Sequence, residues 1–273
     1  MTTTTTQEAF LRDFHSRHPA VTARTLGAGR APDGRSSYEV LAGLVAGCGR
    51  VLDLGCGDGP LLEVLARTRG TRTTGLDLSP EALALARRRP APAGARVVEG
   101  RAQQLPISRG SFDAVASHMA LMLMGDVEQV AAEAARVLVP GGVLACAVGG
   151  GAAGGEAYEL FVALLRATLG DAPPDQRIPA LGDRRTRTRE GFDAVFVPAG
   201  FAPSGWRTVP IDLGGSAEQV WSTVSGVYDL APLDEAAVAG LRTAFLTEAA
   251  ALAGPDGRVP CAFTMHFVTS CLA

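Results

Sequence analysis

From about residue 50 onward, short apolar runs alternate with stretches in which apolar residues recur at helical spacing. Buried parallel strands typically form continuous apolar runs, and helices connect them as crossovers. The pattern therefore predicts an α/β domain with a mostly parallel sheet. The expected strands are residues 51–54, 73–78, 95–99, 111–118 and 143–148, and helices are expected between them, most clearly over 61–66 and 126–138.

The first 47 residues have a different pattern. Residues 1–7 are a threonine-rich tract that we expect to be disordered. Residues 8–18 and 38–45 predict two short helices, the second capped by Ser36-Ser37, with a glycine-containing loop over 24–37. We interpret residues 1–47 as an N-terminal helical lid and residues 48–273 as the α/β domain.

The chain after the fifth strand predicts a cap over the domain. Residues 149–155 are rich in glycine and alanine and suggest a hinge, and the segments about 150–190 and 214–232 are expected as cap insertions. Five arginines lie within 177–189, where they could clamp an anionic substrate or form a solvated loop with internal ion pairs. The remaining elements are expected as helices at 156–169, 191–199, 217–228 and 233–253 and strands at 206–213 and 260–270.

Composition narrows the class of protein. A chain of 273 residues forms one large domain, or a domain with a small cap. A net charge of −3 gives no indication of nucleic acid or of an anionic membrane surface as a partner. No apolar run has the length of a membrane span, and no signal peptide is expected. Five cysteines lack ligand spacing, which argues against a metal site or disulfides and favours a reducing cytoplasm.

The first strand runs into a glycine turn, Val51 to Pro60, that predicts a ligand site. Gly55 and Gly57 match a dinucleotide motif, but Pro60 occupies its third glycine position. Asp53 ends the strand, where its charge would repel phosphate. A phosphate-binding P-loop needs a lysine, and all 25 basic residues of this chain are arginine. The turn therefore favours a polar ligand with a cationic end.

The second strand also ends in an acid. Asp77 lies 22 residues beyond Gly55, and a carboxylate at such a position can accept hydrogen bonds from both hydroxyls of a ribose. Dinucleotide enzymes share this spacing, so Asp77 alone does not choose the ligand. Ser79-Pro80-Glu81 then opens a helix as N-cap, first-turn proline and first-turn acid.

These motifs, with Gly100–Pro106 and Leu138-x-Pro140-Gly141-Gly142, resemble the class I S-adenosylmethionine (SAM)-dependent methyltransferases. The resemblance covers about residues 48–150, and the run Ser117–Met124 is similar to small-molecule enzymes of bacterial secondary metabolism, including antibiotic biosynthesis. It implies a Rossmann-like, seven-stranded sheet of order 3-2-1-4-5-7-6 with helices on both faces. It also implies SAM as the methyl donor and S-adenosylhomocysteine as its product.

The resemblance assigns roles to particular residues. Asp53 is expected at the methionine moiety and Asp77 at the ribose. Arg101 stands where the family has an aspartate that accepts from the adenine amino group, and arginine has no acceptor. Gln103 could supply the acceptor, and Arg101 could stack on the adenine instead. The candidate cofactor-binding residues are Asp53, Gly55, Gly57, Asp77, Leu78, Arg101, Ala102, Gln103 and Ser117.

The fourth strand ends in Ser117-His118, at the edge of the sheet where α/β proteins bind ligands. A methyl group on a sulfonium is already activated, so the protein must chiefly hold a nucleophile in line with it. His118 is the catalytic candidate, because an ordinary imidazole suits base chemistry near neutral pH. Packing at the strand end, or orientation of the substrate, stays open as its alternative role. The candidate substrate-binding residues are Tyr38, Met119, Met122, Trp221 and Tyr228, and no metal ligands are expected.

Four functions compete. The favoured one is a cytoplasmic methyltransferase that acts on an oxygen, nitrogen or carbon of a small-molecule metabolite. A nucleic-acid or protein methyltransferase is disfavoured by the acidic charge balance and by the absence of an Asn-Pro-Pro-aromatic motif. A SAM-binding cyclase or binding module, and an NAD-dependent oxidoreductase, are the other two. The sequence leaves monomer and homodimer open.

Overall fold

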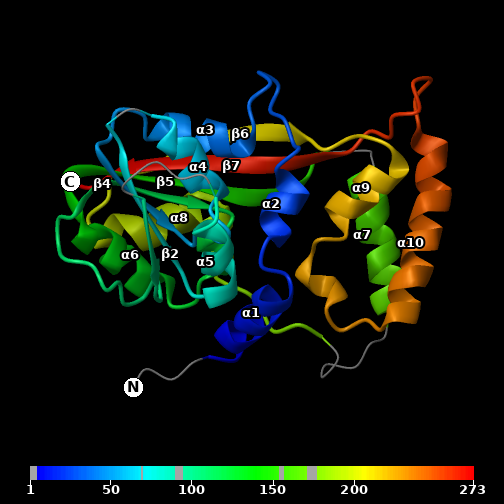
Figure 1. Ribbon diagram of the computed structural model, residues 1–273, viewed down its shortest axis with the longest axis horizontal. Helices are drawn as coiled ribbons and strands as arrows, with labels where there is room; N and C mark the ends of the chain where they lie inside the picture. Colours follow the sequence, from blue (N-terminus) through cyan, green and yellow to red (C-terminus); the bar gives the residue numbers. More distant parts are fainter. Residues whose placement is uncertain (1–4, 69, 90–94, 154–156, 171–176) are drawn as a thin grey trace.

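One seven-stranded sheet organises the computed structural model, which describes residues 5–68, 70–89, 95–153, 157–170 and 177–273 (Figure 1). Within these residues the strand order is β3-β2-β1-β4-β5-β7-β6, with β7 antiparallel to both of its neighbours. The expected order is confirmed. The strands are β1 Arg50–Leu54, β2 Arg72–Asp77, β3 Arg96–Glu99, β4 Phe112–His118, β5 Leu138–Ala152, β6 Gly205–Asp212 and β7 Ala262–Cys271.

Helices cover both faces of the sheet. Side chains alternate between the faces along each strand, so Val51 and Ala114 pack in one core and Leu52 and Val115 in the other. Helices α3 (Ser37–Leu44) and α4 (Pro60–Ala66) cover the first face, and α6 (Val127–Val137) and α8 (Arg189–Phe196) cover the second. Helix α5 (Pro80–Ala86) follows β2. Among the described residues, none of the helices is both long and apolar enough to span a bilayer.

The β5–β7 ribbon is longer than expected. It stays paired as far as Ala152 opposite Phe263, with a register shift between Gly149 and Gly151. The expected hinge is therefore wrong over 149–152, because these residues continue the strand, and residues 154–156 lie outside the described part of the chain. The ribbon carries Phe263 toward the cap.

Three helices form a cap beyond the end of the ribbon: α7 (Ala157–Leu169), α9 (Ala217–Val224) and α10 (Glu235–Ala249) (Figure 1). Phe161, Trp221 and Phe245, one from each helix, pack their rings together. Helix α10 lies outside the cap insertions expected from the sequence, yet it packs against α7 and α9.

The N-terminal segment is ordered earlier than expected. Helix α1 (Thr6–Arg17) begins with a capping box, in which Thr5 and Glu8 exchange side-chain and backbone hydrogen bonds. Disorder is therefore wrong for residues 5–7, whereas residues 1–4 lie outside the described part of the chain. A further helix, α2 (Val21–Leu26), occupies part of the expected loop and contacts α9.

Candidate functional site

The carboxyl ends of β1 and β4 bring Asp53 and His118 to the same face of the sheet. Asp53 is in register with Ala116, and His118 lies two residues further along β4, so both side chains point toward α3. The ring of Tyr38, from α3, stacks on the His118 imidazole with ring centroids 4.0 Å apart. These three side chains line a narrow cavity, which we call the strand-end cavity.

Asp53 is the least compensated charge of this cavity. Its side chain is 1% exposed, and neither carboxylate oxygen has a hydrogen-bond partner among the described residues. Burial, and secondarily the charge of Asp77, raise its pKa well above the usual value. Asp58, held by Arg89, and Asp77 also line the cavity, and no described arginine does. An unpaired buried carboxylate is costly, and a cationic ligand group placed beside Asp53 would offset that cost.

The glycine turn connects β1 to α4 and holds Asp77 at the end of β2. Gly55 and Gly57 have φ values of 76° and 52°, which favour glycine. The Gly57 N–H donates to Asp77 Oδ2 at 2.8 Å, and the Ser79 N–H donates to Oδ1 at 2.9 Å. Each oxygen retains capacity for a second hydrogen bond. The Asp77 carboxylate is thus oriented in advance, as the ribose role requires.

His118 does not have the pKa expected from its sequence. Burial lowers its pKa to about 3, so the ring is neutral at physiological pH. Its Nε2 lies 2.9 Å from the Ser37 hydroxyl, and its Nδ1 has no partner among the described residues. An imidazole held neutral in this way is a weak base, but it can still hydrogen bond to a ligand through Nδ1.

Ser117 faces away from the cavity, because it is adjacent to His118 on the strand. Its hydroxyl donates to the Leu54 carbonyl at 2.8 Å and accepts from the Leu121 N–H at 3.1 Å. The side chain is fully buried and lines neither the strand-end cavity nor the two cavities next to it. The expected cofactor contact of its side chain is therefore not formed by this geometry, and Ser117 instead ties β4 to the turn after it.

A second small cavity lies under helix α1, and we call it the α1 cavity. The expected cofactor residues Leu78, Arg101, Ala102 and Gln103 line it, together with Glu8 of α1. Arg101 forms an ion pair with Glu8 at 2.6 Å. The Arg101 guanidinium is thus held by the Glu8 carboxylate, whereas the sequence suggested that it could stack on the adenine. The Gln103 amide donates to the Gly125 carbonyl at 2.7 Å. Its side-chain oxygen accepts no hydrogen bond from the described residues, which leaves it available for the expected acceptor role.

We expect the Glu8–Arg101 pair to hold α1 over the cavity. Both side chains are largely buried, at 11% and 23% exposure, so Glu8→Gln and Arg101→Gln should each weaken docking by about 1–3 kcal/mol. Limited trypsin digestion, followed by mass spectrometry, should show faster cleavage after Arg12 and Arg17. The double variant should be little worse than either single variant, because the two residues act as one pair. Additive effects would contradict the pairing.

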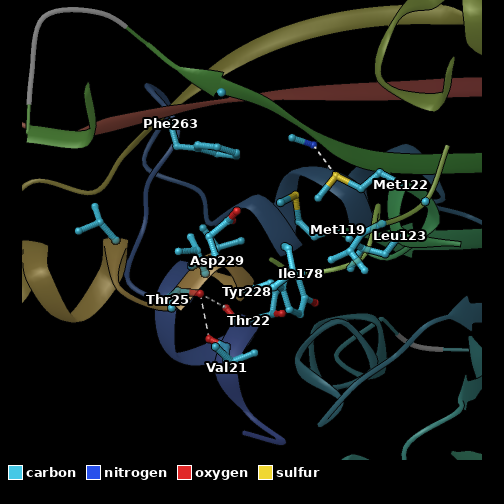
Figure 2. Close-up of a pocket in the computed structure, with 18 of the residues that line it drawn as sticks. Val21, Thr22, Thr25, Met119, Met122, Leu123, Ile178, Tyr228, Asp229 and Phe263 are labelled. Atoms are coloured by element: carbon cyan, nitrogen blue, oxygen red, sulfur yellow. Dashed lines mark hydrogen bonds between the residues drawn. The ribbon is translucent and has the colours of Figure 1, made fainter. Parts of the chain in front are cut away.

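The largest of the three cavities, which we call the large cavity, adjoins the strand-end cavity and has a volume of about 720 Å³. Three of the expected substrate-binding residues, Met119, Met122 and Tyr228, line it (Figure 2). Phe263 of β7 lines it as well. Met119 and Tyr228 line both cavities, so they form the shared wall. Met119 has a φ of 57°, a conformation rare for a non-glycine residue and common at functional sites.

Two of the five expected substrate residues lie elsewhere. Tyr38 lines the strand-end cavity and not the large one. Trp221 is 8% exposed and lines none of the three cavities, because its ring packs between Phe161 and Phe245 in the cap. The expected substrate contact of Trp221 is replaced by a core role. Its position on an amphipathic helix was compatible with either role.

Two residues of α1 lie at the site although neither is among the candidate site residues predicted from the sequence. His15 lines both small cavities, and its Nε2 lies 3.1 Å from the Tyr228 hydroxyl, so it links α1 to the cap. Burial lowers its pKa. In the sequence, Glu8 has the position of the last residue of a helix capping box. That motif gives no indication that Glu8 also pairs with Arg101.

Comparison with known proteins agrees with this arrangement. Residues 52–146 match the family described as "Methyltransferase domain". This segment belongs to the methyltransferase domain family. The domain contains Asp53, the glycine turn, Asp77 and His118, and the family uses S-adenosylmethionine.

The sequence likeness to individual relatives also covers only part of the chain. A fatty-acid O-methyltransferase from Mycolicibacterium smegmatis is 44% identical over 94 residues. That match spans 34% of this chain and 34% of the relative, so the chain covers about a third of the relative's length.

The fold likeness extends much further than the sequence likeness. The cyclase SpnF has a TM-score of 0.58 at 22% identity, covering all of this chain and 97% of its own. A Haemonchus contortus phosphoethanolamine N-methyltransferase, in complex with S-adenosylhomocysteine, has a TM-score of 0.58 at 18% identity, covering 96% of this chain and 59% of its own.

Proposed function

We propose that the protein is a SAM-dependent methyltransferase that transfers the methyl group to an oxygen, nitrogen or carbon nucleophile of a small-molecule metabolite. The observation that carries the proposal is Asp53. A cationic ligand would offset the cost of the two buried, unpartnered oxygens of this carboxylate, and Asp53 lies at the carboxyl end of the first strand of a methyltransferase domain. The ammonium of SAM would be that cationic group.

The residues of the two small cavities fit the other parts of SAM. Asp77 presents oriented carboxylate oxygens for ribose hydroxyls, and the α1 cavity, walled by Leu78, Ala102 and Gln103, would receive the adenine. When bound, SAM supplies a methyl group already activated on a sulfonium. Helix α1, held by Glu8 and Arg101, would keep water from the site.

The large cavity would hold the acceptor, since it shares Met119 and Tyr228 with the strand-end cavity. Its volume lies within the ordinary range for small-molecule sites. Enclosure by the cap and by the N-terminal helices suits a metabolite better than a nucleic acid, whose backbone needs an open basic groove.

Two measurements test the proposal. Isothermal titration calorimetry should detect binding of SAM and S-adenosylhomocysteine but not of NAD. Incubation with SAM and a metabolite extract should then produce S-adenosylhomocysteine and a product heavier by one methyl group. Failure to bind SAM would refute the proposal, whereas SAM binding with product formation that consumes no SAM would favour a cyclase of the same fold.

His118 gives a prediction about the chemical step. Because burial lowers its pKa to about 3, turnover should show no inflection attributable to this residue between pH 5 and 8. His118→Ala should lower kcat about tenfold or more, the usual effect of losing a positioned group, and should change SAM affinity less. Stopped assays with the identified acceptor, across that pH range, make the measurement. Equal losses in turnover and SAM affinity would assign His118 to cofactor packing.

A further inference from the structure

The segment after the undescribed residues 171–176 places two arginines on the wall of the large cavity. Arg184–Arg187 forms a 3-10 helix, in which side chains three positions apart lie on the same face. Arg184 and Arg187 are three positions apart, and both line the cavity. Thr186, between them, is fully buried, so the helix has one face in the protein and one toward the cavity.

The 3-10 helix is docked firmly against the rest of the site. Gly182 precedes it with a φ of 64°, and a Cβ there would lie 1.9 Å from the Met122 carbonyl oxygen, so only glycine permits this approach. Asp183 caps the helix, and Arg185 pairs with Asp183 at 2.6 Å and with Glu128 at 2.7 Å. The backbone that carries Arg184 and Arg187 is therefore held in place, and their side chains are exposed toward the cavity.

Arg184 and Arg187 differ from Arg185 in their partners. Within the described residues neither has an ion pair or a hydrogen-bonded carboxylate. Desolvation by the surrounding protein, and secondarily the charge of Arg184, lower the pKa of Arg187. Asp229 is the other charged residue among those that line the cavity, so two arginines against one aspartate leave a net positive wall.

The remaining surface of the cavity is mostly apolar. Met119, Met122, Ile178 and Phe263 contribute to it, and Figure 2 shows their side chains converging on one space. Neither Arg184 nor Arg187 lines the strand-end cavity, where Asp53 and His118 lie. The positive charge thus lies away from the place where the methyl group would be delivered.

We propose that the acceptor is an apolar molecule with an anionic oxygen group, and that Arg184 and Arg187 bind this group as an anchor. The anion is then not the atom that receives the methyl group. Guanidinium groups bind carboxylate and phosphate through paired, charge-assisted hydrogen bonds. The inference rests on the proposed function only for the identity of the reacting end, because anion binding can be measured without turnover.

Three probes of one shape test the anchor: 6-phenylhexanoate, its neutral amide, and 5-phenylpentyl phosphate. Calorimetry with the full chain, saturated with S-adenosylhomocysteine, should give about tenfold or more tighter binding for an anionic probe than for the amide. The anionic probe that binds more tightly indicates whether the acceptor's anionic group is a carboxylate or a phosphate. Equal affinity of all three probes would overturn the proposal.

Matched variants assign the preference to the two arginines. Arg184→Gln/Arg187→Gln should reduce the preference to less than about twofold, whereas Arg185→Gln, which changes a paired arginine of the same helix, should retain it. If the double variant still prefers the anionic probes over the amide, the assignment to Arg184 and Arg187 is wrong. Formation of a methyl ester of 6-phenylhexanoate in the presence of SAM would also overturn the proposal, because the anion would then be the methyl acceptor. Binding of S-adenosylhomocysteine, measured on the same samples, separates these outcomes from a failure of the proposed function.

Discussion

Asp53→Asn should make the ligand-free protein more stable while it weakens SAM binding. The native carboxylate is buried and has no partner among the described residues, so removing its charge should raise the free energy of unfolding by about 1–3 kcal/mol at pH 7. The same substitution should weaken SAM binding about 10- to 100-fold, because a charged hydrogen-bond partner of the ammonium is lost. Thermal unfolding and calorimetry measure the two effects.

The stabilisation should depend on pH. The folded-state pKa of Asp53 is raised, chiefly by burial. Its penalty is therefore absent below the unfolded pKa, near 4, grows as pH rises from there toward the folded pKa, and is constant above it. Melting curves of the wild-type protein and the variant should converge near pH 4 and separate toward pH 8.

Asp113→Asn is the matched control for Asp53. Asp113 is paired with Arg50 at 2.6 Å, and that pairing lowers its pKa. Its loss should therefore destabilise the fold, by about 0.2–1 kcal/mol for a partly exposed pair, and leave SAM affinity unchanged. A ligand-free Asp53→Asn protein that melts below wild type at pH 7 would contradict the view that Asp53 is held at a cost for its ligand.

Gly55→Ala should damage the fold and the site together. The residue has a φ of 76°, and a Cβ there would lie 2.3 Å from the Ala120 Cβ. The left-handed backbone costs about 1–2 kcal/mol for alanine, and the overpacking costs about 1–3 kcal/mol more. We expect urea denaturation to show a loss of about 2–5 kcal/mol, with SAM binding weakened in the fraction that folds.

Gly57→Ala and a double variant separate the two causes. Gly57 also has a positive φ, of 52°, but apart from its two chain neighbours no described residue has an atom within 4 Å of the site of its Cβ. Its substitution should cost only the backbone term of about 1–2 kcal/mol. Gly55→Ala/Ala120→Gly should recover the packing part of the loss, since it removes the contacted methyl group. Equal losses in the two glycine variants, with no recovery, would refute the close approach to Ala120.

The sequence alone was sufficient for the parts of the site that depend on local order. These parts are the glycine turn Val51–Pro60, Asp77 and His118. Each lies on a strand or turn that a short local pattern of apolar residues, glycines or helix caps is enough to predict. Parallel strands then bring their carboxyl ends to one edge, so adjacency of Asp53 and His118 follows from the strand order. The fold and the strand-end residues were predictable for this reason.

What the tertiary structure decided is the environment of those residues. Arg101 meets Glu8 across 93 positions, His118 is neutral because α3 covers it, and Trp221 turns into the core between two other helices. The arginines of residues 177–189 look alike in the sequence. Because the 3-10 helix packs on Met122, Arg184 and Arg187 line the large cavity, whereas Arg185 is paired with carboxylates. Burial and pairing are set by elements distant in sequence, and no local pattern records which of them will meet.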